Sequence, residues 1–211
     1  MKEYTTLVVA LILSYLVMNG QSRYEKEMQS ALDSLNSSEE LQDFKKVVNK
    51  FEQISRVEKD KWLPHYYVGY VYTVMTYFDK DTESRDLALD KAQEYVEKAR
   101  RLKPKNEEIS ILQAYIYQSR FFISPMTRLT TFVKSSKAIA KVVELYPDNP
   151  RANLLQGIQF FHKPSFLGGG SNKAKPFFKK AEKLFTNDES KNLFYPNWGR
   201  ETNKYYSDKC K

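Results

Sequence analysis

The chain has 211 residues, of which 41% are hydrophobic and 14% aromatic. This composition argues against disorder and leaves room for one domain with a substantial core. The formal net charge of +8 is spread over many separate lysines and arginines, whereas a nucleic-acid-binding module would show one basic stripe. Cys210 is the single cysteine, so no internal disulfide can form. Its thiol is either free or paired between chains, and the simpler interpretation is an exposed residue without a role.

The first twenty residues have the layout of a secretory signal peptide. Lys2 precedes an apolar run from Leu7 to Met18, and small polar residues follow. A run of about twelve apolar residues is short for spanning a bilayer, and no cysteine near the cleavage region supports a lipoprotein anchor. We therefore expect residues 1–20 to be removed and the mature domain, residues 21–211, to reside in the periplasm or outside the cell.

The spacing of apolar residues predicts four pairs of helices in chain order, and no strand pattern appears. The pairs are expected over residues 22–56, 62–103, 107–146 and 150–185, and a C-terminal cap over 186–211. We expect Phe194 and Trp198 in this cap to cover the open end of the stack, because terminal repeats must shield one face.

A recurring pattern of small and large apolar residues marks both helices of each pair. In the second helices it consists of Ala92, Val96, Ala99 and Leu102, then Ile139, Val142 and Leu145, then Ala174, Phe178, Ala181 and Leu184. In the first helices it consists of Gly69 with Tyr72, Ala114 with Tyr117, and Gly157 with Phe160. Small residues let neighbouring helices approach closely, so the pattern predicts an array of helical hairpins.

Over roughly residues 40–185 this pattern resembles a degenerate tetratricopeptide repeat (TPR). The spacing departs from the family, because Gly69 and Ala114 are 45 residues apart and Pro104 and Pro147 are 43 apart, against a family repeat of 34. The period alone would also suit HEAT or armadillo arrays. The surplus falls between the two helices of each pair, where long turns account for it. The resemblance implies an all-α, right-handed superhelix of antiparallel helix pairs, a TPR-like α-solenoid similar to exported bacterial TPR proteins.

No constellation of residues indicates catalysis, a metal site or a cofactor. The run from Gly168 to Ser171 lacks the lysine of a P-loop and follows no strand, so a tight turn is the better interpretation. His65 and His162, the only histidines, have no ligand-like spacing around them. Acidic pairs such as Glu107-Glu108 lie at helix starts, where the helix dipole favours negative charge. We therefore predict a protein that is not an enzyme.

The resemblance to the TPR family implies a binding surface, because the first helix of each TPR pair lines a concave groove. The corresponding residues here are Tyr66, Tyr70, Thr73, Ile111, Tyr115, Gln118, Leu154, Ile158 and Phe161. The alternative is that these side chains are core contacts. The two interpretations are equally supported for the tyrosines, whose hydroxyls prefer water or a partner. For Ile111, Leu154 and Ile158 the core interpretation is favoured.

The resulting hypothesis is an exported interaction module that binds a protein or peptide partner in its groove. A first alternative is an accessory protein of a transport system that binds a small solute, and a second is a structural envelope protein whose stack self-associates. An aromatic pocket closed by residues 162–172 would favour the solute, whereas an open groove would favour a peptide. The oligomeric state is not predicted.

Overall fold

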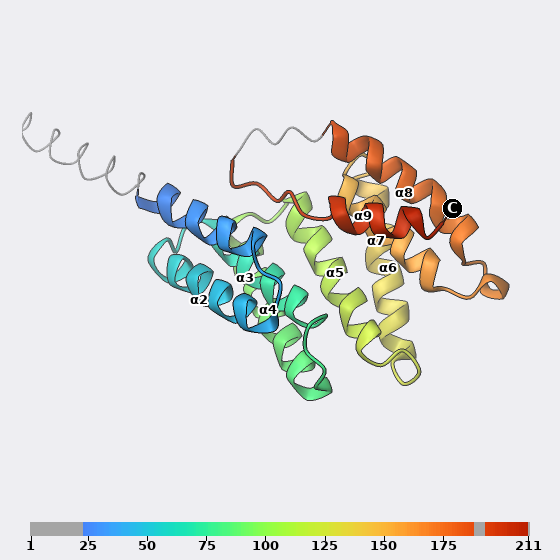
Figure 1. Cartoon of the computed structure of the whole chain (residues 1–211), viewed down its shortest axis with the longest axis horizontal. Coiled ribbons are helices and arrows are strands. Elements are labelled where there is room, and N and C mark those ends of the chain that lie inside the picture. Colours follow the sequence, from blue (N-terminus) through green and yellow to red (C-terminus); the bar gives the residue numbers. More distant parts are fainter. Residues whose placement is uncertain (1–22, 188–192, 211) are drawn as a thin grey trace, which may run out of the picture.

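The structure, a computed structural model, describes residues 23–187 and 193–210 and is entirely helical over that part of the chain, which confirms the all-α prediction (Figure 1). After a helix over residues 23–36, the elements are α2 (Leu41–Val57), α3 (Trp62–Met75), α4 (Thr82–Leu102), α5 (Glu107–Ile123), α6 (Leu129–Leu145), α7 (Pro150–His162), the short 3-10 helix η1 (Ser165–Leu167), α8 (Ser171–Thr186) and α9 (Arg200–Asp208). The expected signal peptide lies outside the described residues. Within them, no helix combines the length and apolar character needed to cross a membrane.

Consecutive helices pack against each other along the chain. The main pairs are α3 with α4, α5 with α6, and α7 with α8. In addition, α3 contacts α5 and α5 contacts α7, so the first helices of successive pairs are neighbours. This arrangement gathers the inner faces of α3, α5 and α7 on one side of the molecule (Figure 1).

Small residues set how closely the paired helices approach. A Cβ atom added at Gly69 would lie 3.0 Å from Val96 on α4, and one added at Gly157 would lie 2.5 Å from the Phe178 ring on α8. The predicted second-helix faces are buried at Ala92, Val96 and Ala99, at Ile139 and Val142, and at Ala174, Phe178 and Ala181. The expectation fails in the last turn of α4 and of α6, where Leu102 and Leu145 are 40% and 54% exposed. The packed face of these two helices ends one turn before the helix does.

Asparagine and aspartate side chains cap three helices. Asp81 accepts a hydrogen bond from the Ser84 amide, Asn106 from Ile109, and Asn149 from Arg151. Such caps satisfy amides that have no partner within the helix.

Glu108 lies in the first turn of α5, as expected, and also forms a buried ion pair. Its side chain is fully buried, and its carboxylate accepts hydrogen bonds from Arg151 Nε at 2.8 Å and Nη2 at 2.9 Å and from Asn149 Nδ2 at 2.6 Å. This buried ion pair joins α5 to α7.

The C-terminal tail corrects the expectation of an end cap. The Tyr67 hydroxyl of α3 donates to the Phe194 carbonyl at 3.0 Å, and the Phe194 ring packs edge-on against Tyr24 in the first described helix. The tail therefore returns to the beginning of the array before α9 reaches α8 (Figure 1). Phe194 thus packs against the first described helix and α3, whereas Trp198 lies against α3 and α5. Neither residue takes the place expected of an end cap. Cys210 is also not exposed, because it is buried in a cluster with Phe178 and Ala181.

Candidate functional site: an aromatic pocket

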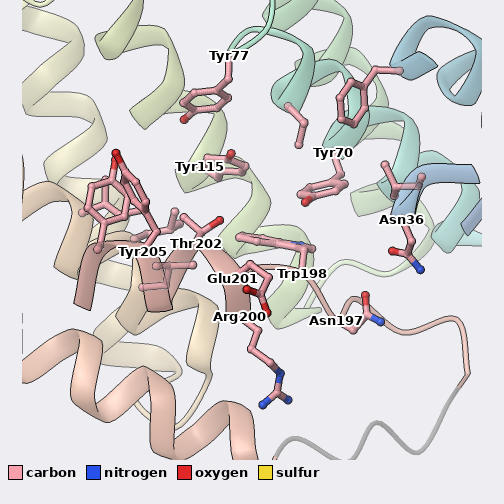
Figure 2. Close-up of a pocket in the computed structure, with 18 of the residues that line it drawn as sticks. Asn36, Tyr70, Tyr77, Tyr115, Asn197, Trp198, Arg200, Glu201, Thr202 and Tyr205 are labelled. Carbon is pink, nitrogen blue, oxygen red and sulfur yellow. The ribbon is translucent and has the colours of Figure 1, made fainter. Parts of the chain in front are cut away.

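A pocket of about 690 Å³ lies between the inner faces of α3, α5 and α7 and the returning tail (Figure 2). Its size is within the range of about 300–1,000 Å³ that is usual for small-molecule sites. The described residues that line it are mainly aromatic and aliphatic, and they include Phe44, Tyr70, Val74, Tyr77, Tyr115, Phe122, Leu154, Ile158, Trp198 and Tyr206. We call this cavity the aromatic pocket.

A row of nearly parallel rings forms one wall of the aromatic pocket. The Trp198 ring stacks with Tyr70 at 5.2 Å and 24° and with Tyr115 at 5.3 Å and 21°. Tyr115 stacks in turn with Tyr77 at 6.2 Å and 20°. Figure 2 shows Tyr70 and Tyr115, from two different helices, projecting toward Trp198 from the tail. Offset rings cover only part of one another's faces, and the parts left uncovered suit another flat, apolar group.

The position of Trp198 is fixed by a hydrogen bond and by the glycine that follows. The indole N–H donates to the Tyr66 hydroxyl at 2.7 Å. Gly199 has φ +105°, a backbone conformation that residues with a Cβ rarely adopt. A Cβ there would also lie 2.8 Å from Leu154 Cδ2. Any side chain at position 199 would therefore strain the turn that directs Trp198 toward the tyrosines.

The aromatic pocket carries little charge on its inner surface. Burial raises the pKa of Tyr70 and of Tyr115 above the usual tyrosine value, so both are neutral phenols at pH 7. Glu201 and Arg200 are the charged residues among the described lining residues. In Figure 2 the guanidinium group of Arg200 points away from the tyrosines, and it donates a hydrogen bond to the Phe185 carbonyl. The interior thus suits an uncharged, apolar surface.

Four of the nine residues implied by the TPR resemblance line the aromatic pocket, namely Tyr70, Tyr115, Leu154 and Ile158. Tyr66 is fully buried and holds Trp198. Thr73 is buried and donates to the Gly69 carbonyl within α3.

The remaining three lie elsewhere. Ile111 is buried in a cluster with Ala152 and Leu155, and Gln118 lines a second, smaller cavity. Phe161 packs edge-on against Tyr206 of α9 at 5.2 Å.

Sequence reasoning missed the contribution of the tail to the pocket. Trp198 and Tyr206 both line it, although the sequence predicts only a C-terminal cap over residues 186–211. The available signal was the aromatic run Tyr195-Pro196-Asn197-Trp198-Gly199, in which an indole precedes a glycine. The tail, and not residues 162–172, forms one side of the aromatic pocket, whereas residues 162–167 contribute to a second cavity.

Comparison with known proteins identifies a similar solved structure. No protein-family model and no curated protein matches the chain. Among solved structures, the HusA haemophore from Porphyromonas gingivalis is similar, with a TM-score of 0.80 and 26% sequence identity over 89% of this chain and 92% of the haemophore chain. The likeness therefore extends over nearly the whole of both chains.

Proposed function

We propose that this protein is a small-molecule-binding protein that carries haem or a related porphyrin in the aromatic pocket. The observation that carries the proposal is the row of parallel rings of Tyr70, Trp198 and Tyr115 beside a cavity of about 690 Å³. A porphyrin is a large, flat, apolar ring, and such a ring stacks favourably on aligned aromatic side chains. The structural likeness to a haemophore supports the choice of this ligand among flat molecules.

The residues of the pocket suit the porphyrin ring better than its iron. The lining contains no histidine, cysteine or methionine within the described part of the chain. Tyrosine can ligate haem iron. However, the raised pKa values of Tyr70 and Tyr115 disfavour the phenolate form that a ferric ion prefers. Recognition therefore rests on the faces of the ring, and metal-free protoporphyrin IX is expected to bind about as tightly as haemin.

The hypothesis of a peptide-binding groove has less support. The chain's own tail crosses the inner faces of α3 and α5, where a bound peptide would lie, and Trp198 stacks on two of the tyrosines expected to contact it. The solute-binding alternative predicts an aromatic pocket closed by residues 162–172; these residues do not line the pocket, and the aromatic side of it that supports a solute is formed by the tail. No observation favours the structural envelope alternative.

Three further expectations remain part of the proposal. We propose that the helix pairs form a right-handed, TPR-like superhelix, supported by the contacts of α3 with α5 and of α5 with α7. The protein would act by binding, without catalysis, after export by its N-terminal signal peptide.

A fluorescence titration tests the ligand. The chain has two tryptophans, and Trp62 does not line the aromatic pocket. Replacing Trp62 by phenylalanine keeps a ring against Tyr66 and leaves Trp198 as the only indole. Haemin should then quench the emission of Trp198 in a saturable manner at one equivalent. Haemin absorbance that changes on binding without this quenching would mean that the ligand occupies another site, and the absence of any binding would refute the proposed function.

A further inference from the structure

The formal net charge of +8 originates in one part of the chain. Basic residues occur along the whole sequence, but acidic ones are scarce between the last turn of α5 and the end of α8. Residues 121–187 contain eleven lysines and arginines and only three acidic residues. Residues 1–120 and 188–211 taken together are neutral. A region with so one-sided a charge attracts anionic surfaces.

The arginines of this region are neutralised, whereas most of its lysines are not. Arg151 forms the buried pair with Glu108, and Arg128 pairs with Asp86 of α4. Of the nine lysines in the region, only Lys180 has an ion pair within the described residues. The positive charge that is available to a partner is therefore carried by lysines.

Three exposed apolar side chains lie at the two turns of the same region. Met126, between α5 and α6, is 90% exposed, and Phe166 and Leu167, in η1 between α7 and α8, are 86% and 57% exposed. The two turns are neighbours, because Pro125 and Leu167 line the same smaller cavity (Figure 1). Large apolar side chains exposed together mark a contact surface.

Lysines flank these apolar turns, and acidic residues are absent from them. Lys163 precedes η1, and Lys173 and Lys175 lie at the start of α8. The sequence has no acidic residue from 121 to 143 or from 149 to 181. We call the two turns, with these three lysines, the basic turn edge.

The combination of exposed apolar tips and flanking lysines matches the surface of a lipid bilayer. Apolar side chains enter the boundary between headgroups and acyl chains, while lysines beside them contact anionic headgroups. A protein interface instead gathers its apolar residues in a closely packed centre, whereas Met126 and Phe166 lie at the tips of two turns. We propose that the basic turn edge binds an anionic phospholipid bilayer, with Met126 and Phe166 inserted into its surface.

Co-sedimentation of the ligand-free mature chain, residues 21–211, with lipid vesicles tests the proposal. Vesicles of phosphatidylcholine are compared with vesicles of equimolar phosphatidylcholine and phosphatidylglycerol. The chain should bind the mixed vesicles at least about tenfold more tightly than the neutral ones, because each lysine near an anionic surface adds to the affinity. Added salt should weaken binding to the mixed vesicles, since it screens this attraction.

Two variants separate the apolar tips from other exposed apolar residues. Met126→Ser/Phe166→Ser alters side chains that are almost fully exposed, so the fold should be retained. It should bind the mixed vesicles about tenfold more weakly or worse, because the apolar area that would enter the bilayer is lost. The matched control, Val57→Ser/Leu87→Ser, removes two exposed apolar side chains from α2 and α4 and should bind like the unaltered chain.

A second pair of variants tests the position of the charge. Lys173→Gln/Lys175→Gln should weaken binding to the mixed vesicles roughly 10- to 30-fold. The control Lys45→Gln/Lys46→Gln removes the same charge from α2, away from the basic turn edge, and should bind nearly like the unaltered chain.

Three outcomes would overturn the proposal: equal binding to neutral and mixed vesicles, no binding to either, or test variants that bind like their controls. Failure to bind either kind of vesicle would leave an acidic protein as the partner that the charge attracts. None of these outcomes depends on whether the aromatic pocket binds a porphyrin.

Discussion

The buried ion pair between Glu108 and Arg151 allows a quantitative prediction about stability. Replacing Arg151 by methionine keeps the apolar part of the side chain but leaves the fully buried Glu108 carboxylate without its cation. Breaking a buried pair in this way costs about 3–5 kcal/mol. For a chain of this size, the midpoint of thermal unfolding should therefore fall by roughly 6–20 °C.

Removing both partners should cost less than removing one. In Glu108→Met/Arg151→Met no charge remains to be desolvated, so the loss should reduce to about 1–3 kcal/mol for the Asn149 amide that loses its acceptor. Arg120→Met is the control, because Arg120 pairs with Asp86 and Asp90 near the surface and such pairs contribute little.

Urea unfolding followed by circular dichroism at 222 nm measures all three variants. The reasoning would be refuted if Arg151→Met lost less than about 1 kcal/mol, or if the double variant were less stable than the single one.

Three other predictions address packing, ionisation and burial. Gly157→Val should destabilise the chain by about 1–3 kcal/mol in urea unfolding, because its added atoms meet the Phe178 ring; an unchanged midpoint would contradict the close approach of α7 and α8. Burial, together with the positive charge of Lys98, lowers the pKa of His65 below its usual value. Protonation of His65 therefore favours the unfolded chain, and the free energy of unfolding that is present at neutral pH decreases as the pH falls through the lowered pKa. The unfolding midpoint should therefore fall between pH 7 and pH 5 by less in His65→Phe than in the unaltered chain, and equal slopes would exclude this origin. Cys210 should react with Ellman's reagent only at the rate of unfolding, whereas immediate reaction of the native chain would show that the thiol is accessible.

Local patterns in the sequence were sufficient to predict the helices. The spacing of Ala92, Val96 and Ala99 reports a face buried against the neighbouring helix, and all three are fully buried. The glycines at 69 and 157 reflect contacts with the next helix. Such contacts join helices that are adjacent in the chain, so the small residues at these contacts recur at regular intervals in the sequence.

The pocket could not be predicted in the same way, because it depends on contacts between distant parts of the chain. Trp198 bonds to Tyr66 across 132 residues, and Tyr67 reaches Phe194 across 127. Nothing in the local composition of the tail indicates which helices it will contact. The role of Glu108 was missed for the same reason, since its partner Arg151 lies 43 residues away on another helix.

The central claim, that aromatic faces in the pocket bind a porphyrin, is tested most directly by the haemin affinity of two variants of α5. Tyr115→Ala removes a ring that stacks on Trp198, whereas Tyr117→Ala removes the same side chain from a position that does not line the pocket and instead contacts Lys134. Stacking of a planar group on one aromatic side chain is worth about 1–3 kcal/mol. The account predicts that Tyr115→Ala binds haemin roughly 5- to 150-fold more weakly while Tyr117→Ala binds like the unaltered chain. Equal affinity in a folded Tyr115→Ala variant would contradict it.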